Sequence, residues 1–518
     1  MSNYKEELLQ HELTPETLEE YSEKVRRELK AFFEPEAIAV IGASRDVNAP
    51  GWVIFKNLLE NKEKGWLKAD VYGVNIKGGE LFGQPLYRSI LDVPSDVDHA
   101  VIVIPAKYVP GAMEECGKKG VKVASIISAG FSEIGNVELE KRVVEVARKY
   151  GIRIIGPNGL GVFDAYSGVD TMFLPYCKPL NGKELLATPR PKKGYIMFIS
   201  QSGALGVSVL DYMYGEGIGV SKFISYGNKA DVDEVDMLLY ALKDETVRVV
   251  MIYLEGLKGD GRPLVKIGKE FSKHKPIVIL KGGRTKAGAR ATMSHTASLA
   301  GNVKIYQVAF ETMGAIMADD LVEFLDVTKA LAFQPPARGR NIAIVTNGGG
   351  AGILATDKAE KIGLNVIPTP ENLLAKLKKA QEEGKIPPVA TFSNPIDLSG
   401  SASNESYIAA IEAVMENDDI HAVLIIGLHH VPLLTSSFVD EIAQIIKKYK
   451  KPVVAVDIGG ADMANWVRDR FDYHGIPAYP TPERGITALK ALVEYGEWLK
   501  KEGVLENYLQ KWQPPTSL

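Results

Sequence analysis

Short apolar strands alternate with amphipathic helical segments along most of the chain. Strands of the first series are expected at residues 37–44, 70–77, 99–106, 121–131 and 152–161. Between the later strands, apolar residues of the segments 109–119 and 137–150 recur at helical spacing. Strands that are apolar throughout and alternate with helices are typical of a parallel sheet covered on both faces. The pattern therefore predicts an α/β, doubly wound fold.

The same alternation starts again twice. YIMFISQSGALG (195–206) opens a second series with expected helices at 205–213, 232–242 and 262–274 and a last strand at 275–283. NIAIVTNGGG (341–350) opens a third series. Segments rich in Pro, Gly and charged residues, 179–194 and 334–339, predict linkers between the series. A chain of 518 residues is long enough for about three domains.

Both ends of the chain predict helical extensions. In residues 4–33 leucines recur at helical spacing, and Thr14 before Pro15 predicts an N-cap and a first helical residue. This arm either packs on a neighbour or is a solvated amphipathic extension. Residues 486–512 predict one amphipathic helix. The expected division is therefore an N-terminal helical arm (1–33), three domains (34–180, 190–333 and 340–492) and a C-terminal helical tail (493–518).

Composition narrows the class of protein. The chain is 46% hydrophobic and 24% charged, with a net charge of −4, which is ordinary for a soluble globular protein and gives no broad basic field for nucleic acid. Its two cysteines, Cys116 and Cys177, suggest neither a disulfide framework nor a CxxC metal site, and they fit a cytoplasmic location. We expect neither a signal peptide nor a membrane span, because no apolar run is long enough.

One histidine stands in an unusual setting. His295 lies in the segment 281–302 (KGGRTKAGARATMSHTASLAGN) among hydroxyls and small residues, after Lys281, Arg284, Lys286 and Arg290. Since no large apolar residue occurs between Leu280 and Met293, the segment is predicted to be a mobile or solvent-facing loop. An imidazole there could accept a phosphoryl group, which nearby cations and backbone N–H groups would attract. The alternative is a surface loop with an incidental histidine.

Two small-residue turns predict anion sites. Ser202, Gly203 and Ala204 follow a strand and open a helix, and Gly348, Gly349 and Gly350 do the same in the third series. Such turns present free N–H groups and a positive helix dipole to a phosphate. Glu255 ends a strand on the same sheet edge as Ser202, where its carboxylate could hold one N–H of His295. Its alternative role is to cap the following helix.

The edge of the first sheet predicts a nucleotide site that differs from an ordinary NAD site. Gly42, Ala43 and Ser44 follow the first strand, but the GxGxxG pattern is missing. Lys77 stands where a ribose-binding carboxylate would end the second strand, although a solvated loop lysine is the simpler interpretation. Further turns at the same edge include Ser128, Ala129 and Gly130. A cation in place of a carboxylate favours a phosphate-rich nucleotide such as coenzyme A.

Two other features of the sequence predict no definite site. His429 and His430 follow a strand, but no matching ligand cluster is visible, so we assign no metal site to them. Residues 392–402 (FSNPIDLSGSA) predict a loop that could line a site.

Seven motifs occur in a characteristic order: IGPNGLG (155–161), FISQSGALG (198–206), SYGNKADV (225–232), YLEG (253–256), SHTASLAG (294–301), TNGGGAG (346–352) and SNPIDLSG (393–400). Together they resemble the α subunit of the NDP-forming acyl-CoA synthetases, the acetate–CoA ligase (ADP-forming) branch of the succinyl-CoA synthetase superfamily. The resemblance covers residues 34–492, and SHTASLAG, close to the family's SHTGSLAG, is its most specific motif. It implies a Rossmann-like CoA-binding domain followed by two flavodoxin-like domains.

The resemblance also implies roles for the candidate residues. His295 would be the phosphorylated histidine and Glu255 its partner. Ser202–Ala204 and Gly348–Gly350 would bind its phosphate, and the turns at Gly42–Ser44, Lys77 and Ser128–Gly130 would contact CoA. The implied reaction converts acyl-CoA, phosphate and ADP to a carboxylic acid, CoA and ATP through an acyl phosphate and a phosphohistidine. The reverse direction makes acyl-CoA.

Some positions depart from the family pattern. Ala297 replaces a usual Gly, Gly159 stands where GPNCLG has Cys, and Ile76 replaces the Pro of Asn-Pro-Lys. Val207 stands where the succinate enzymes carry Tyr, which favours the acetate-type branch.

The family needs an ATP-grasp module for ATP/ADP and Mg²⁺, and too few residues follow Leu489 to build one. We therefore expect a separate ATP-grasp β subunit in an α₂β₂-type assembly. Two alternatives remain: a non-catalytic CoA-binding regulatory protein that kept the fold, and an NAD-dependent dehydrogenase, which the missing GxGxxG disfavours.

Overall fold

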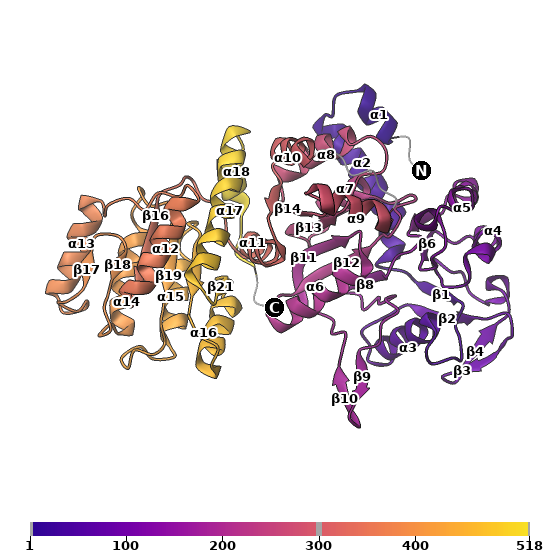
Figure 1. Ribbon diagram of the computed structural model, residues 1–518, viewed down its shortest axis with the longest axis horizontal. Coiled ribbons are helices and arrows are strands. Elements are labelled where there is room, and N and C mark those ends of the chain that lie inside the picture. The colour runs from indigo at the N-terminus through magenta and orange to yellow at the C-terminus, as the bar shows by residue number, and fades with distance from the viewer. Residues whose placement is uncertain (1–3, 297–302, 516–518) are drawn as a thin grey trace. The chain divides into compact units, whose positions relative to one another are not determined.

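The computed structural model describes residues 4–296 and 303–515, and for residues 293–296 it describes the backbone alone. The chain contacts divide it into two compact units, Met1–Ala315 and Ile316–Leu518. The first unit contains two large sheets and a separate two-stranded hairpin, and the second unit is built on a third large sheet (Figure 1). The predicted α/β, doubly wound architecture is confirmed in all three sheets.

The first sheet has the strand order β3-β4-β2-β1-β5-β6-β7. Its strands are β1 (Ala37–Ile41), β2 (Asp70–Val74), β3 (Gly79–Leu81), β4 (Gln84–Tyr87), β5 (His99–Ile102), β6 (Val123–Ile126) and β7 (Arg153–Ile155). β3 is antiparallel to β4, whereas the other pairs are parallel. β1 lies between β2 and β5, so the strand order reverses there. In such sheets ligands bind beyond the carboxyl ends of the strands at the point of reversal.

The helices of the first sheet are α3 (Pro50–Glu63), α4 (Val109–Lys119) and α5 (Val137–Tyr150). The bounds of α4 and α5 agree with the predicted segments. Both helices end because Gly120 and Gly151 adopt the left-handed conformation, with φ of 86° and 71°. Apolar side chains of both helices pack on β5 and β6 in one buried cluster, which includes Met113 and Val143.

The second sheet contains, in spatial order, β14 (Ile277–Lys281), β13 (Val249–Leu254), β11 (Lys193–Ser200), β12 (Val220–Ser225) and β8 (Gly161–Asp164). β8 is antiparallel to β12, and the other neighbours are parallel. Its helices are α6 (Gly203–Gly215), α7 (Glu234–Leu242), α8 (Arg262–Ser272), α9 (Lys286–Thr296) and α10 (Val303–Thr312). β8 is the next strand in the chain after β7 of the first sheet, so the segment 156–160 connects the two sheets.

The segment 179–194, predicted as a linker, instead contributes to a hairpin of β9 (Cys177–Leu180) and β10 (Lys183–Leu186). Asn181 and Gly182 form its turn with φ of 52° and 76°, as a two-residue Asn-Gly hairpin turn requires. The prediction was wrong because every residue of both strands is exposed, so no burial pattern marks them. Figure 1 shows the hairpin extending away from the second sheet.

The N-terminal arm consists of α1 (Tyr4–Gln10), α2 (Pro15–Leu29) and a 3₁₀ turn at Lys30–Phe32. Thr14 caps α2 and Pro15 is its first residue, as predicted. The arm is not a solvated extension, because Leu8 and Val25 are buried. It packs on α7 and α8 of the same chain, and the Tyr4 hydroxyl donates a hydrogen bond of 2.6 Å to Asp236 (Figure 1).

The third sheet has the order β17-β18-β16-β19-β20-β21. Its strands are β16 (Ile342–Thr346), β17 (Thr391–Phe392), β18 (Ile396–Asp397), β19 (Ala422–Ile426), β20 (Val453–Val456) and β21 (Ala478–Tyr479). The predicted loop at 392–402 therefore contains β18, which is parallel to β16. The strand order reverses at β16, between β18 and β19.

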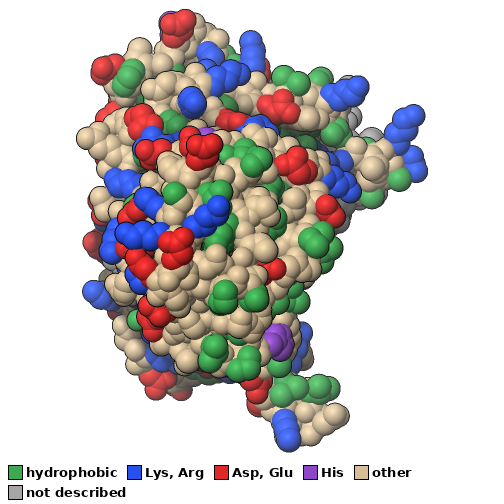
Figure 2. All heavy atoms as spheres, turned by 90° about the vertical axis from the view of Figure 1, so that its left-hand side faces the viewer, with side chains coloured by type: hydrophobic (Ala, Val, Ile, Leu, Met, Phe, Trp, Pro, Cys, Tyr) green, Lys and Arg blue, Asp and Glu red, His purple; other side chains and the backbone are tan. Residues whose placement is uncertain are grey.

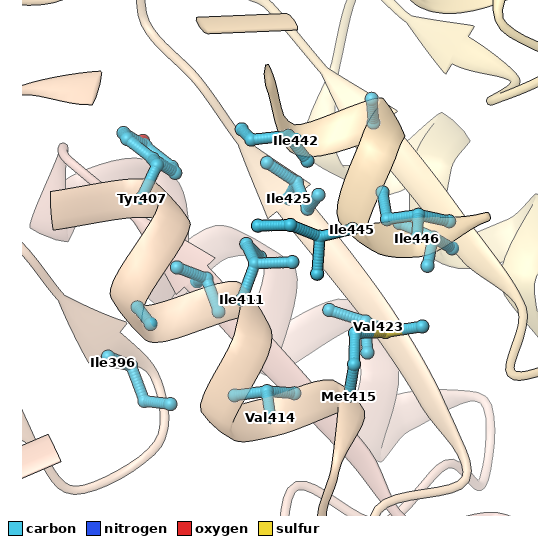
Figure 3. Close-up of a cluster of buried hydrophobic side chains, with 14 of the residues drawn as sticks. Ile396, Tyr407, Ile411, Val414, Met415, Val423, Ile425, Ile442, Ile445 and Ile446 are labelled. Carbon is cyan, nitrogen blue, oxygen red and sulfur yellow. The ribbon is translucent and has the colours of Figure 1, made fainter. Parts of the chain in front are cut away.

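The remaining elements of the second unit are β15 (Ile316–Ala318), α11 (Leu321–Phe333), α12 (Gly349–Lys361), α13 (Glu371–Glu382), α14 (Asn404–Met415), α15 (Phe438–Ile446), α16 (Asp462–Tyr473), α17 (Pro482–Lys501) and α18 (Leu505–Lys511). Ile411 of α14 and Ile442 of α15 both point toward the part of β19 that carries Ile425 (Figure 3). The prediction of one helix at 486–512 was wrong: Gly503, with φ of 73°, separates α17 from α18.

The surface carries charges of both signs. Figure 2 shows one face of the molecule, on which Lys and Arg side chains are interspersed with Asp and Glu. Within the described residues no helix is long and apolar enough to cross a membrane. A search of the same residues finds no cluster of three or more His, Cys, Asp or Glu side chains that could hold a metal ion.

Candidate functional site

The segment that precedes His295 is a helix rather than the predicted loop. α9 spans Lys286–Thr296, and the hydroxyl of Thr285 accepts the backbone N–H of Gly288 at 3.0 Å, which is an N-cap interaction. The prediction failed because it required large apolar residues, whereas alanines favour a helix without forming an apolar stripe. The side chain of His295 and the positions Ala297 and Ser298 lie outside the described residues.

The turn after β14 connects α9 to Glu255. A side chain at Gly283 would meet Thr292 of α9 at 2.6 Å, and one at Gly282 would lie 3.6 Å from the Glu255 side chain. Gly282 and Gly283, at the start of the His295 segment, therefore lie beside the Glu255 side chain and α9. Glu255 is buried, with 4% of its surface exposed. Burial, together with the neighbouring Glu255, raises the pKa of Tyr253.

Gln201 fixes the backbone around Glu255. Its side-chain oxygen accepts the N–H groups of Glu255 and Gly256 at 2.8 and 3.1 Å. Gln201 immediately follows β11, whereas Glu255 follows β13, so this amide links the ends of two neighbouring strands. Gln201 lies in the motif FISQSGALG, but the motif alone predicts no role for its amide. The partner is 54 residues away, so no local pattern could have indicated it.

Two buried lysines hold the same turn. The Lys281 ammonium donates to the Glu255 carbonyl at 2.7 Å, and the Lys229 ammonium donates to the Gly256 carbonyl at 2.6 Å and to Glu234 at 2.7 Å. Burial lowers the pKa of Lys281 to about 8, although Glu255 opposes the shift. We had predicted Lys281 as one of several cations in a solvent-facing loop, whereas only 3% of its surface is exposed. Together these lysines bring positive charge next to Glu255.

The turn Ser202–Ala204 opens α6 as predicted. The Ser202 hydroxyl accepts the Leu205 N–H at 3.3 Å and so caps the helix itself. The first N–H groups of a helix, here those of Gly203 and Ala204, have no acceptor within the helix and can bind an anion. The arrangement fits the predicted phosphate site through the backbone.

There is a steric reason for glycine at position 159, where the family pattern GPNCLG has Cys. A side chain at Gly159 would lie 2.6 Å from the Ser225 carbonyl, and the Ser225 hydroxyl accepts the N–H of Leu160 at 2.9 Å. Leu160 in turn lies 3.1 Å from the position that a Gly203 side chain would take. The segment after β7 is therefore packed directly on the phosphate turn, and a larger residue would displace it.

The glycine turn of the second unit opens α12. Gly348 is the N-cap residue of this helix, and its N–H donates to the Thr346 hydroxyl at 3.0 Å. This leaves the N–H groups of Gly349 and Gly350 at the start of the helix, where no intrahelical acceptor exists. Gly349 lies against Asp397, since a side chain there would meet a carboxylate oxygen at 2.8 Å.

The first sheet brings the predicted CoA residues to its point of reversal. A side chain at Gly42 would lie 2.4 Å from the Val103 carbonyl, and φ at this position is 109°, so only glycine fits. The Asn75 amide donates to the Ala43 carbonyl at 2.8 Å and connects the turns after β1 and β2. Lys77, two residues after Asn75, is exposed and makes no ion pair within the described residues. A free cation beside small-residue turns suits the phosphates of CoA.

The other candidate CoA-binding residues, Ser128, Ala129 and Gly130, differ in the groups that they leave open to a ligand. The Ser128 hydroxyl is engaged by the backbone of Ile104, and the N–H of Gly130 donates to Glu133. Ala129 is exposed between them. These contacts leave the backbone around Ala129, rather than the Ser128 hydroxyl, open to a ligand.

Three family matches cover most of the chain and define its class. Residues 36–164 match a CoA binding domain, residues 193–331 a succinyl-CoA ligase like flavodoxin domain, and residues 342–501 a ligase-CoA domain. The first and second matches include the edges at Gly42 and Glu255, and the third includes the turn at Gly348. The fold and the site thus define a chain of the succinyl-CoA synthetase type.

The similar proteins identify the branch. The α subunit of acetate–CoA ligase (ADP-forming) I of Pyrococcus furiosus is 41% identical over 485 residues, which is 91% of this chain and 99% of the relative. Acetate–CoA ligase (ADP-forming) of Methanocaldococcus jannaschii is 39% identical and is covered over 65% of its length. A solved acetyl-coenzyme A synthetase 1 from Candidatus Korarchaeum cryptofilum, in complex with phosphate and ADP, has a TM-score of 0.81 and 38% identity, with 92% of this chain and 98% of that chain covered. The chain belongs to the ADP-forming acyl-CoA synthetase family and corresponds to its α subunits.

Proposed function

We propose that this protein is the α subunit of an ADP-forming acyl-CoA synthetase that acts through a phosphohistidine at His295. The observation that carries the proposal is the connection between α9 and Glu255 through the turn after β14. The proposal is supported by the contacts of Gly282 and Gly283, where the segment begins, and by Gln201, Lys229 and Lys281, which hold the Glu255 turn at the same sheet edge.

The proposed reaction has three steps. Phosphate attacks the acyl-CoA thioester, which forms an acyl phosphate and releases CoA as its thiol. His295 then takes the phosphoryl group through one ring nitrogen and releases the carboxylic acid. Finally the phosphohistidine transfers the group to ADP and gives ATP. Glu255 accepts the other imidazole N–H, and the N–H groups of Gly203 and Ala204 stabilise the phosphoryl oxygens.

The CoA-binding domain supplies the thioester. We assign its binding to the edge at Gly42–Ser44, the exposed Lys77 and the backbone around Ala129. Gly348–Gly350 at the start of α12 provide a second set of N–H groups for the phosphate or the acid.

A separate subunit completes the enzyme in this proposal. The P. furiosus relative, which this chain covers over 99% of its length, is named as an α subunit, whereas the single M. jannaschii chain is covered over only 65%. The additional length of the single chain is consistent with a nucleotide-binding part that other members carry as a β subunit. We expect an ATP-grasp β subunit that binds ATP/ADP and Mg²⁺ in an α₂β₂-type assembly.

Phosphate labelling tests this function. The chain isolated with its co-purifying subunit, incubated with γ-labelled ATP and Mg²⁺, should take up acid-labile, base-stable label. His295→Ala should abolish the label, because alanine has no ring nitrogen to accept the phosphoryl group. His11→Ala, a change at an exposed position of the arm, serves as the matched control and should retain it.

The opposite result would favour the alternative. If a preparation with a verified nucleotide-binding subunit takes up no label in either the parent chain or the His11 control, the catalytic function is wrong. CoA binding measured by calorimetry in that preparation would then support the non-catalytic regulatory protein.

A further inference from the structure

The second unit contains a histidine–aspartate pair at the edge of its sheet. The His429 Nδ1 atom lies 2.8 Å from the Asp457 carboxylate. The Asp457 side chain has no exposed surface and that of His429 is 10% exposed. A buried carboxylate accepts a hydrogen bond from the nearer ring nitrogen. It therefore favours the tautomer with the proton on Nδ1 and none on Nε2.

The pair lies beside the point where the strand order reverses, because His429 follows β19, a neighbour of β16, and Asp457 follows β20. β16 and β19 are parallel neighbours with Thr346 opposite Ile426, and β19 and β20 are neighbours with Ile426 opposite Val456. The turns that follow these strands therefore place Gly348, His429 and Asp457 on one edge. Asn347 joins two of the turns, since its side chain both donates to the Leu428 carbonyl at 3.0 Å and accepts the Leu428 N–H at 2.9 Å. Ligands of parallel α/β sheets bind at this edge.

The orientation of the ring is strongly constrained. His430 stacks on His429 with ring centroids 3.9 Å apart and an interplanar angle of 30°. On the other turn, a side chain at Gly459 would lie 3.6 Å from the His429 ring. The Arg468 guanidinium donates to the carbonyls of Asp457 and Gly459 and so holds that turn in place.

The second ring nitrogen has no partner among the residues that the structure describes. Within the described residues the hydrogen bonds of the His429 ring are those of Nδ1 to Asp457, and Nε2 makes none. Nε2 is not among the fully buried polar atoms that lack a partner in the described part of the chain, so a ligand or water can reach it. With the proton on Nδ1, Nε2 is a hydrogen-bond acceptor.

We propose that His429, positioned by Asp457, accepts a hydrogen bond from an O–H group of the substrate bound at the turn Asn347–Gly350. The N–H groups of Gly349 and Gly350 and the dipole of α12 hold the anionic part of that ligand. The O–H group belongs either to a hydroxyl of the carboxylic acid or to a singly protonated phosphate. The proposal rests on the proposed function, because it concerns the substrate of the same reaction. It gives a role to His429, to which the sequence analysis assigned no metal site.

Steady-state kinetics of the complex of this chain with its co-purifying subunit test the proposal. The probes are phosphate and two matched pairs of acids, acetate with glycolate and butyrate with 4-hydroxybutyrate, each assayed in the direction of acyl-CoA formation or with its CoA thioester. His429→Phe keeps the stacked ring and removes the acceptor, so the KM of the recognised ligand should rise about 10-fold. If the acid is recognised, the rise is confined to the hydroxylated member of a pair. If phosphate is recognised, the KM of phosphate rises with every acid.

Two further variants separate recognition from support of the fold. Asp457→Asn offers an amide that donates to Nδ1, which turns Nε2 into a donor, and it should therefore raise the same KM as His429→Phe does. His429→Gln restores an acceptor oxygen and should recover part of the affinity. His430→Phe, the matched control, preserves the stacking and should leave every KM unchanged.

Unchanged KM values for phosphate and for all four acids in His429→Phe would overturn the proposal. So would an equal rise in His430→Phe, since that would indicate a general loosening of the turn. Labelling of His295 from ATP distinguishes this failure from that of the proposed function. A labelled His429→Phe chain with unchanged KM values contradicts the recognition residue alone, whereas an unlabelled parent chain contradicts the proposed function.

Discussion

A single buried histidine should make the first unit sensitive to acid. His99 on β5 has no exposed surface, contacts the Phe32 ring edge-on and lies 2.8 Å from the Ser125 hydroxyl. Burial lowers the pKa of His99 to about 3. The unfolded chain therefore takes up a proton near pH 6.5 that the folded chain does not, and stability falls as the pH decreases below that value. From pH 7 to pH 5 this one group should cost about 2 kcal/mol.

Urea unfolding at the two pH values measures this effect. The double variant His99→Phe with Ser125→Ala replaces the pair by apolar groups and should lose about 2 kcal/mol less than the parent chain over the same interval. The exposed His11→Phe should lose as much as the parent. Equal losses in the parent and the double variant would show that His99 is protonated in the folded chain.

Residues whose partners are close in sequence were predictable, and residues with distant partners were not. Thr14 was recognised as an N-cap because it bonds three residues ahead. Glu255 was placed at the correct sheet edge because strand ends share an edge in a parallel sheet. In contrast, the burial of Lys281 and the pairing of His429 with Asp457 depend on neighbouring strands, 26 and 28 residues away. No spacing rule connects such positions.

At the scale of elements, the start of α9 should depend on one hydroxyl. Thr285→Ala removes the acceptor of the Gly288 N–H and should cost about 1 kcal/mol of helix stability. We expect faster amide exchange in residues 286–292 and slower labelling of His295, because the helix that carries it frays. Thr285→Ser keeps the hydroxyl and should behave as the parent does. Unchanged exchange in Thr285→Ala would mean that packing of Thr292, rather than the cap, fixes α9.

Elements with a buried face were predicted better than elements without one. The bounds of α4 and α5 followed from their apolar stripe and from the glycines that end them. The β9–β10 hairpin is exposed throughout and was assigned to a linker, although its Asn-Gly turn was visible in the sequence. α9 was missed for the same reason, since its alanines give propensity without periodicity.

At the scale of the whole molecule, a buried charge network joins the arm to both sheets of the first unit. Arg153 on β7 forms ion pairs with Glu28 of α2 at 2.6 Å, with Asp231 at 2.8 Å and with Asp236 of α7 at 2.7 Å. Asp236 is fully buried and also accepts hydrogen bonds from Tyr4 and Lys5. The arm thus stabilises the arrangement of the two sheets that carry the Gly42 edge and the Glu255 turn.

Deletion of residues 1–12 should therefore destabilise the first unit beyond the loss of a surface helix. It removes Tyr4 and Lys5, and breaking one side of a buried charge network typically costs about 3–5 kcal/mol. Hydrogen exchange should accelerate in β11 and β13 while β19 in the second unit keeps its protection. Adding Asp236→Asn to the truncated chain removes the uncompensated charge and should restore part of the protection, whereas Glu16→Ala on the exposed face of α2 should change neither unit. If the truncated chain exchanges as slowly as the parent, the two sheets hold together without the arm, and Arg153 alone is sufficient to neutralise Asp236.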